Sequence, residues 1–197
     1  MIYIARHGQT SWNLQGRKQG RKDSPLTLKG FSQARNVAEI LNHNIESYDK
    51  FKIVVSPQWR CQQFASIICE ISGLKFSDCI LEEDLREHCF GLWEGKNEEE
   101  IEKQFPGFLQ KRYKPENYWS YIVPMGESYE LLYNRVSQIV DKYSGENIIY
   151  ICHEMVSKVM RGYILDLQPK EILPLKHPQD IVYKISNKKI LELRSGI

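Results

Sequence analysis

Two short apolar runs that each end on a histidine constrain the fold of this chain more than any other feature. Residues 2–5 lead into Arg6 and His7, and residues 148–152 lead into His153. Apolar, β-prone runs of this length are typical of buried strands in a parallel sheet. Because open α/β sheets bind ligands at the carboxyl ends of their strands, each histidine is expected at the ligand-binding end of its strand.

The rest of the chain alternates between strand-like and helix-like spacing of apolar residues. Thr27 is a suitable N-cap for a helix that buries Phe31, and Leu131 is expected on the apolar face of a later helix. This alternation predicts a layered α/β domain. The expected elements lie at residues 28–44, 51–55, 60–73, 80–87 (extended), 97–105, 127–143, 148–152, 156–164, 181–185 and 190–193.

The residues around the first histidine suit a bound phosphate. Arg6 offers a planar fork of donors to an oxyanion, and Gly8 lets the backbone turn sharply or approach a ligand closely. Arg6-His7-Gly8, followed by Asn13, resembles the signature of the histidine phosphatase (phosphoglycerate-mutase-like) superfamily. Further motifs appear in family order as far as about Leu167. The resemblance implies a three-layer α/β/α fold with a mostly parallel central sheet.

The resemblance also implies roles for the residues that match the motifs. His7 corresponds to the nucleophile that becomes phosphorylated, and nearby arginines disfavour its protonated form. Arg6 and Arg60 are the candidate phosphate clamps, because fixed cations stabilise a phosphoryl group in transfer. Arg60 lies in the segment 56–63, which resembles a family motif with serine, arginine and glutamine at these spacings.

Glu87 matches the general acid of the family. A carboxyl group beside bound phosphate has a raised pKa, so it can protonate the leaving alkoxide and later activate water. The neighbouring acids Glu82, Glu83 and Glu94 compete for this role and are interpreted as solvated. The choice of Glu87 among them depends on the resemblance alone.

His153 resembles the second histidine of the family, which binds the phosphate and stabilises its transition state. Glu154 stands where the family usually has glycine, and Lys158 stands where arginine is frequent. Glu154 either begins a helix, where the helix dipole favours an acid, or places a carboxylate near the phosphate and weakens binding. Because position 157 holds no histidine, the zinc-binding reading of this segment is rejected, and no metal or cofactor is expected.

Asn13, Gln19 and Gly20 match family positions that line the phosphate and substrate mouth. The basic run 17–22 around them is interpreted either as an electropositive entrance for anionic metabolites or as a solvated loop. Residues 97–126 are rich in proline and glycine and are expected to form a substrate-facing cap. The whole chain, residues 1–197, is expected to be one domain.

Composition restricts the class of protein further. A net charge of +2 argues against a dedicated nucleic-acid binder, and no apolar stretch is long enough for a membrane span. The five cysteines form no Cys-x-x-Cys pair, and the first strand leaves no room for a signal peptide, so a cytoplasmic protein with reduced thiols is expected. The oligomeric state stays open, a homodimer included.

The sequence thus favours a metal-independent phosphomonoesterase that acts on small phosphorylated metabolites. Residues 90–95 resemble the phosphatase branch, and the chain ends at Ile197 soon after its last expected strand, without a tail to shield a phosphohistidine from water. The alternatives are a cofactor-dependent phosphoglycerate mutase and a weakly active member that binds a phosphorylated ligand. Sugar phosphates, phosphoglycerates, nucleotides and α-ribazole phosphate all stay open as substrates.

Overall fold

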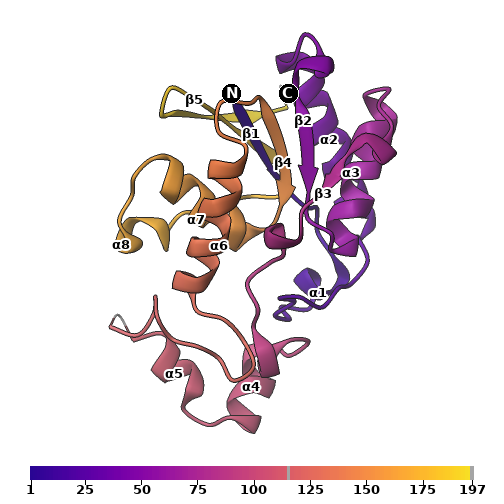
Figure 1. Ribbon diagram of the computed structural model, residues 1–197. Coiled ribbons are helices and arrows are strands. Elements are labelled where there is room, and N and C mark those ends of the chain that lie inside the picture. The colour runs from indigo at the N-terminus through magenta and orange to yellow at the C-terminus, as the bar shows by residue number, and fades with distance from the viewer. Residues whose placement is uncertain (115, 196–197) are drawn as a thin grey trace.

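A six-stranded sheet with strand order β3-β2-β4-β1-β5-β6 forms the centre of the molecule (Figure 1). The computed structural model describes residues 1–114 and 116–195; Pro115, in the expected cap, and residues 196–197 lie outside the described residues. The strands β1 to β4 pair in parallel, and β5 and β6 are antiparallel additions. The strands are β1 (Ile2–Arg6), β2 (Lys52–Val55), β3 (Ile80–Leu81), β4 (Ile148–Cys152), β5 (Ile181–Ser186) and β6 (Lys189–Arg194).

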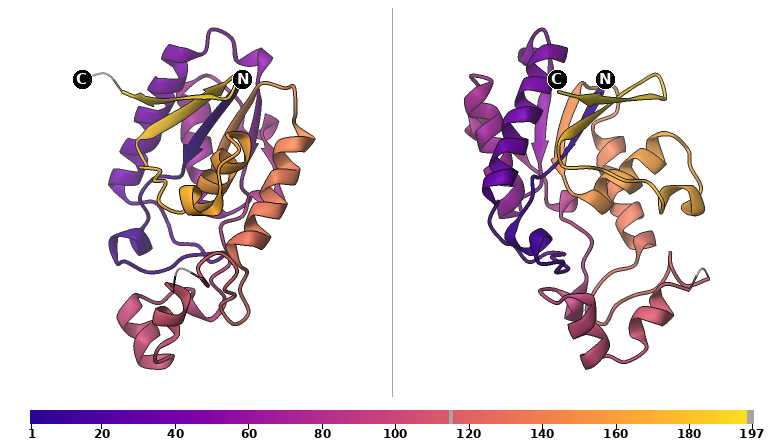
Figure 2. Two further views of the ribbon diagram at one scale, coloured as in Figure 1. Left: turned by 90° about the vertical axis from the view of Figure 1, so that its left-hand side faces the viewer. Right: turned by 180° about the vertical axis from the view of Figure 1, so that it is seen from behind.

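Helices cover both faces of this sheet, which confirms the predicted three-layer fold. The longer helices α2 and α3 pack on one face, and α6 and α7 pack on the other (Figures 1 and 2). The α-helices are α1 (Ser11–Leu14), α2 (Leu28–Asn44), α3 (Trp59–Ile71), α4 (Glu98–Gln104), α5 (Phe108–Arg112), α6 (Tyr129–Lys142), α7 (Glu154–Ile164) and α8 (Pro169–Ile172).

The central strands are apolar throughout because both of their faces are buried. Successive side chains of a strand point to opposite faces, so β4 sends Ile149 and Ile151 toward α2 and α3. Tyr150 of the same strand packs toward α6 and α7, together with Ile4 of β1. This two-sided burial explains why these strands read as continuous apolar runs rather than as alternating ones.

The segment expected as a cap lies beyond the carboxyl ends of the parallel strands (Figure 2). It contains α4 and α5, and Asn97 caps α4 through a reciprocal pair of hydrogen bonds with Glu100. Trp93, Ile101 and Val123 form a small hydrophobic cluster there, separate from the two clusters that flank the sheet. The cap is therefore stabilised by its own apolar side chains.

Several local expectations differ from the structure. Phe31 is 42% exposed and Leu131 is 49% exposed, so neither belongs to the buried face of its helix. The extended segment 80–87 contains only the two-residue strand β3, and a 3-10 turn follows at Glu83–Leu85. Each helix turns other positions toward the sheet, so Phe31 and Leu131 lie on its solvent-facing side although they are hydrophobic. Among the described residues, no helix is long and apolar enough to cross a membrane.

Candidate active site

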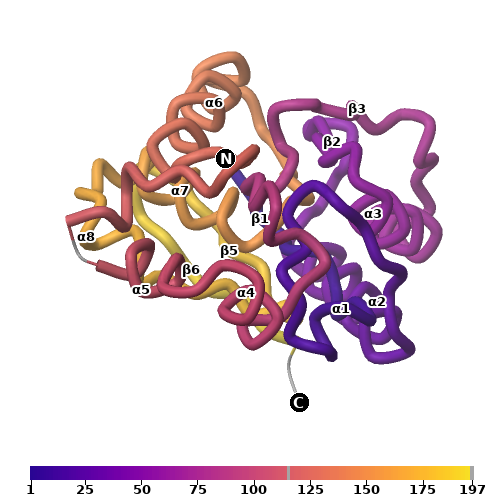
Figure 3. Tube along the Cα trace, turned by 90° about the horizontal axis from the view of Figure 1, so that it is seen from below, coloured from indigo at the N-terminus to yellow at the C-terminus, as the bar shows by residue number. Residues whose placement is uncertain are grey.

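The parallel pairing of β1 with β4 brings the two strand-end histidines together. Arg6 lies opposite Cys152 in this register, and the backbone N–H of His7 donates to the carbonyl of Cys152 at 3.0 Å. The ring centroids of His7 and His153 are 5.2 Å apart. Seen toward the carboxyl ends of the strands, α1, α4 and α5 lie in front of this edge of the sheet (Figure 3).

His7 is held as a neutral ring in a single tautomer. Its Nδ1 lies 2.8 Å from the carbonyl oxygen of Gly8, which can only accept, so Nδ1 carries the proton and Nε2 carries the lone pair. Burial is the main cause that holds the pKa of His7 well below its usual range, and the charges of Arg60 and Arg6 lower it further. From the sequence, the nearby arginines alone were expected to lower the pKa of His7, whereas burial is the larger cause.

Gly8 is required by close packing rather than by a ligand. A Cβ atom at this position would lie 2.5 Å from the carbonyl oxygen of Gly30 in α2. The loop that follows His7 therefore rests directly on the backbone of α2, which fixes the carbonyl that orients the imidazole.

Arg60, in the first turn of α3, is the most firmly positioned cation of the site. Its Nε donates to Nε2 of His7 at 3.2 Å, and its Nη2 donates to the carbonyl of Gly20 at 2.8 Å. Its Nη1 pairs with Asp23 at 2.6 Å, and only 1% of the side chain is exposed. Gly20, expected at the substrate mouth, thus lines the cavity and also holds the guanidinium in place.

Arg6 lies at the end of β1 with its guanidinium shared between two acceptors. Its Nη1 donates to the carbonyl of His177 at 2.7 Å and pairs with Glu154 at 2.9 Å. Its Nε is buried and has no hydrogen-bond partner among the described residues. An oxyanion that reaches Arg6 would therefore meet Nε, which has no partner among the described residues, and Nη1, which is already paired with Glu154.

His153 is fully buried behind His7 and bonds to the end of the neighbouring strand. Its Nε2 lies 2.7 Å from the hydroxyl of Ser56, the residue that follows β2. Burial is the main cause that holds the pKa of His153 well below its usual range, with smaller contributions from Arg60 and from His7. The ring is therefore neutral, and Ser56 fixes its orientation.

Glu87 sits on the opposite side of the cavity, anchored at the N-terminus of α7. One carboxylate oxygen accepts from the backbone N–H of His88 at 2.9 Å, and the other accepts from that of Met155 at 3.4 Å. Gln58 fixes the backbone N–H of Glu87 at 2.6 Å. Burial raises the pKa of Glu87, and the charge of Glu154 adds a smaller upward shift, so this carboxyl group is suited to donate a proton.

Two of the competing acids differ from the sequence interpretation: Glu82 has only 12% of its side chain exposed and pairs with Lys142, and Glu94 is buried. Glu83 pairs with Arg86 at the surface, as expected. Glu94, interpreted as solvated, is buried and accepts N–H groups from Arg21 at 2.9 Å and from Phe90 at 3.1 Å. Glu94 is a structural acceptor for two loop amides. This role is not visible from its position in the sequence.

A cavity of about 240 Å³ joins the predicted site residues, His153 excepted. Asn13 accepts from the amide of Gln179 at 3.0 Å and from the N–H of Thr10 at 3.1 Å, so its own amide N–H groups remain for a ligand. Gln19 is fixed by Ser24 at 3.1 Å. The cavity is lined by Arg6, His7, Asn13, Arg17, Lys18, Gln19, Gly20, Arg60, Glu87, Phe90, Arg112, Tyr113, Tyr118, Tyr129, Glu154 and Met155.

The basic run at the mouth is tied to the cap rather than left in solvent. Arg17 forms a two-pronged ion pair with Glu100, and Lys18 pairs with Glu98 at 2.9 Å. Both acids belong to α4, so these pairs join the loop after α1 to the cap. Both cations still line the cavity, with their charges partly offset.

Sequence reasoning missed Arg112, a buried cation that the cap contributes to the cavity. It is 1% exposed, and its guanidinium carbon lies 4.5 Å from the centre of the Tyr129 ring. Its Nη1 donates to the carbonyl of Tyr121 at 3.0 Å, whereas Nη2 has no partner among the described residues. Nothing in the sequence separates Arg112 from its exposed neighbour Lys111, because the difference is set by how the cap folds.

Two further histidines, His88 and His177, are buried in addition to His7 and His153. Burial is the main cause that holds the pKa of each well below its usual range, with Arg112 lowering His88 and Arg161 lowering His177. The backbone carbonyl of His177 also fixes Arg6. Four buried imidazoles are thus neutral in the folded protein and would become protonated on unfolding in mild acid.

We expect the protein to lose stability steeply as the pH falls below about 6.5, the usual pKa of a histidine in an unfolded chain. Below this pH the unfolded chain binds protons that the buried histidines of the folded protein do not bind. Each buried histidine therefore lowers the stability by up to about 1.4 kcal/mol per pH unit. The raised pKa of Glu87 opposes this loss only in part. Thermal unfolding between pH 7.5 and 5.5 measures the slope, and His177→Asn should reduce it. A flat profile would contradict the neutral burial of these rings.

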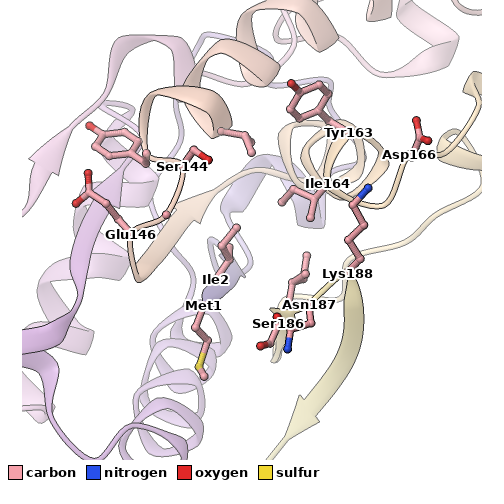
Figure 4. A pocket seen from close by; sticks show the side chains of 14 residues that line it. Met1, Ile2, Ser144, Glu146, Tyr163, Ile164, Asp166, Ser186, Asn187 and Lys188 are labelled. Carbon is pink, nitrogen blue, oxygen red and sulfur yellow. The ribbon is translucent and has the colours of Figure 1, made fainter.

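A larger hollow of about 580 Å³ lies at the amino ends of the parallel strands, around Met1, Glu146 and Asn187 (Figure 4). The described residues that line it include no histidine, cysteine or arginine. The volume of a cavity therefore does not identify the candidate active site, whereas the chemistry of the residues that line it does. Within the described ranges, no group of three His, Cys, Asp or Glu side chains is placed to hold a metal ion.

A mostly parallel α/β sheet with two neutral histidines and two arginines at one edge defines a phosphoglycerate-mutase-like protein. The chain belongs to the histidine phosphatase superfamily (branch 1), whose family model matches residues 2–189. Members of this superfamily are phosphatases or mutases.

Individual relatives include both activities. The chain is 30% identical over 186 residues to "6-phosphofructo-2-kinase/fructose-2,6-bisphosphatase" of Gallus gallus, covering 94% of this chain and 37% of that protein. Over 107 residues it is 38% identical to "Probable phosphoglycerate mutase GpmB" of Enterobacter sp., 54% of this chain and 46% of that protein. The chain thus spans less than half the length of these relatives.

Solved structures share the fold. The α-ribazole phosphatase of Shigella flexneri superposes with a TM-score of 0.82 at 22% identity, covering 99% of this chain and 96% of that one. A mycobacterial glucosyl-3-phosphoglycerate phosphatase in complex with VO3 gives a TM-score of 0.80 at 24% identity, covering 98% and 96%.

Proposed function

We propose that the protein is a phosphomonoesterase that hydrolyses small phosphorylated metabolites through a phosphohistidine at His7, without a metal ion. The observation that carries this proposal is the neutral imidazole of His7, which lines the cavity and whose unprotonated Nε2 accepts from Nε of Arg60 at 3.2 Å. An unprotonated nitrogen with fixed cations around it is what attack on phosphorus requires.

In the first step, Nε2 of His7 bonds to phosphorus as the bond to the ester oxygen breaks. Arg6, Arg60 and Asn13 would hold the phosphoryl oxygens, because their donors line the same cavity. Glu87, whose pKa is raised by burial, would give its proton to the leaving oxygen. In the second step Glu87 would take a proton from water, whose oxygen bonds to phosphorus as the phosphorus–nitrogen bond breaks.

The test is release of inorganic phosphate from a panel of phosphomonoesters in the presence of a chelator. The panel includes p-nitrophenyl phosphate, sugar phosphates, phosphoglycerates, nucleotides and α-ribazole phosphate. Turnover that survives chelation, with an acid-labile phosphoryl group trapped on the protein, is expected. Absence of turnover with every ester, together with binding of phosphate or vanadate, would instead support a phospho-ligand-binding protein.

A phosphoglycerate mutase is the second candidate, favoured by the likeness of half the chain to the GpmB relative. Incubation with phosphoglycerate and a bisphosphoglycerate primer distinguishes the two activities. A mutase would interconvert the phosphoglycerate isomers faster than it released phosphate, and the proposed hydrolase would do the reverse.

Replacing Arg112 by methionine is expected to impair substrates whose alcohol portion carries an oxygen acceptor. Arg112 lines the cavity and its buried Nη2 has no partner among the described residues; one lost charge-assisted hydrogen bond to a substrate corresponds to a KM increase of about 10- to 100-fold. Kinetics with 3-phosphoglycerate and with p-nitrophenyl phosphate measure the difference. The exposed neighbour change Lys111→Met is the matched control. An equal loss on both esters would mean that Arg112 only supports the cap.

A further inference from the structure

Glu154 places a carboxylate directly in the phosphate clamp. Its Oε2 lies 2.9 Å from Nη1 of Arg6, and its Oε1 lies 3.3 Å from Nζ of Lys158 one helical turn further on. The side chain lines the cavity that contains His7 and is 33% exposed. One carboxylate is therefore paired with Arg6, which lines the same cavity, and with Lys158.

The remaining positive charge around His7 is limited. The charge of Arg60 is already offset by Asp23 at 2.6 Å, and both His7 and His153 are neutral. Arg6 is thus a cation of the His7 site that a phosphate group would need, and Glu154 is paired with it as well as with Lys158. A phosphate in the cavity must either displace this carboxylate from Arg6 or bind beside a like charge.

We propose that Glu154 is an internal competitor for the phosphate site, which keeps the binding of free phosphate weak. The side chain is exposed enough to turn toward solvent when an oxyanion reaches Arg6, and it can return when the anion leaves. The role as a product-release device rests on the proposed function, in which phosphate is the product. The competition itself requires no turnover.

Weak retention of phosphate favours hydrolysis over transfer. A mutase must keep its doubly phosphorylated intermediate in the cavity while that intermediate turns over to present its other phosphate. A resident carboxylate that displaces bound phosphate shortens this dwell time, whereas a hydrolase gains from it because its last step is release of phosphate. Glu154 thereby selects between two reactions that can share one phosphohistidine.

Calorimetric titration with inorganic phosphate tests the competition on wild type and Glu154→Gln. Glutamine keeps the shape of the side chain and removes the charge, so phosphate is expected to bind about tenfold more tightly. The matched control is Glu98→Gln, which frees the cavity-lining Lys18 from its ion pair but lies away from Arg6. The control is expected to change phosphate affinity less than threefold, because the ion pair that it removes is exposed and contributes little free energy.

Unchanged or weaker phosphate binding in Glu154→Gln would overturn the proposal, since the carboxylate would then serve to orient Arg6 or Lys158. An equal gain in the Glu98→Gln control would overturn it too, because any lost negative charge would then suffice. Tighter binding in a protein that hydrolyses no ester would uphold the competition and refute the proposed phosphatase. In an active enzyme, the inhibition constant of phosphate should fall by the same factor as its dissociation constant.

Discussion

Replacing His7 by alanine is expected to abolish phosphate release from every ester the protein hydrolyses, by a factor on the order of 10⁴ or more, as for other lost nucleophiles. His7 lines the cavity with its Nε2 unprotonated, and His153 is fully buried with its Nε2 bonded to Ser56. No other described imidazole lines that cavity. Steady-state release of phosphate, with acid-quench trapping of the phosphoprotein, measures the loss.

The matched control is His43→Ala, an exposed histidine near the end of α2. It should retain wild-type activity and wild-type phosphoprotein. A His7→Ala protein that folds, by its thermal unfolding, yet still hydrolyses p-nitrophenyl phosphate at the wild-type rate would refute the phosphohistidine route. Water would then have to attack phosphorus directly.

Replacing Glu87 by glutamine is expected to slow hydrolysis of alkyl phosphates by roughly 10²- to 10⁴-fold, the usual contribution of a general acid. Esters with a good leaving group need little protonation, so the first step with p-nitrophenyl phosphate should be nearly spared. Because the second step still needs Glu87 to activate water, a burst of p-nitrophenol followed by a slow phase is expected. Rapid-quench kinetics on both kinds of ester measure this split.

The pH dependence offers an independent check on Glu87. Its raised pKa keeps the carboxyl group protonated into weakly acidic solution, whereas the lowered pKa of His7 keeps the nucleophile free there. For alkyl esters, kcat/KM should therefore decline as the pH rises through the pKa of Glu87, and the glutamine variant should lose this decline. An unchanged profile, or an equal loss on both kinds of ester, would assign the acid elsewhere.

The fold was predictable because its strongest signals are local. The runs that became β1 and β4 are apolar on both faces, and Thr27 caps α2 through its hydroxyl as expected. Asn187 and Lys188, which lie between the last two expected strands, have positive φ values of 50° and 57°, which suits the tight hairpin between β5 and β6. Each of these features is decided by residues close together in the chain.

The parts that escaped prediction depend on contacts between distant segments. Arg112 becomes a cavity residue only because α5 packs against Tyr129, and Glu94 is buried only because two loop amides need an acceptor. For Glu154 the sequence left two readings. The helix start is confirmed, because Glu154 opens α7. Its carboxylate pairs with Arg6, and the weakening of phosphate binding stays a prediction. A motif thus identifies the chemical group at a position, but not the side chains and backbone groups that it contacts in the folded protein.

The position of β1 within the sheet has a consequence for how the protein is made. Ile2 pairs with Ile148 on one side and with Ile185 on the other, so β1 is synthesised well before the two strands that flank it. Such non-local pairing folds slowly, since the intervening chain must close into a large loop first. On the ribosome, β1 stays unpaired until β4 and β5 emerge, a window in which its apolar edges invite aggregation. The nascent chain is therefore expected to need protection until both of those strands have emerged.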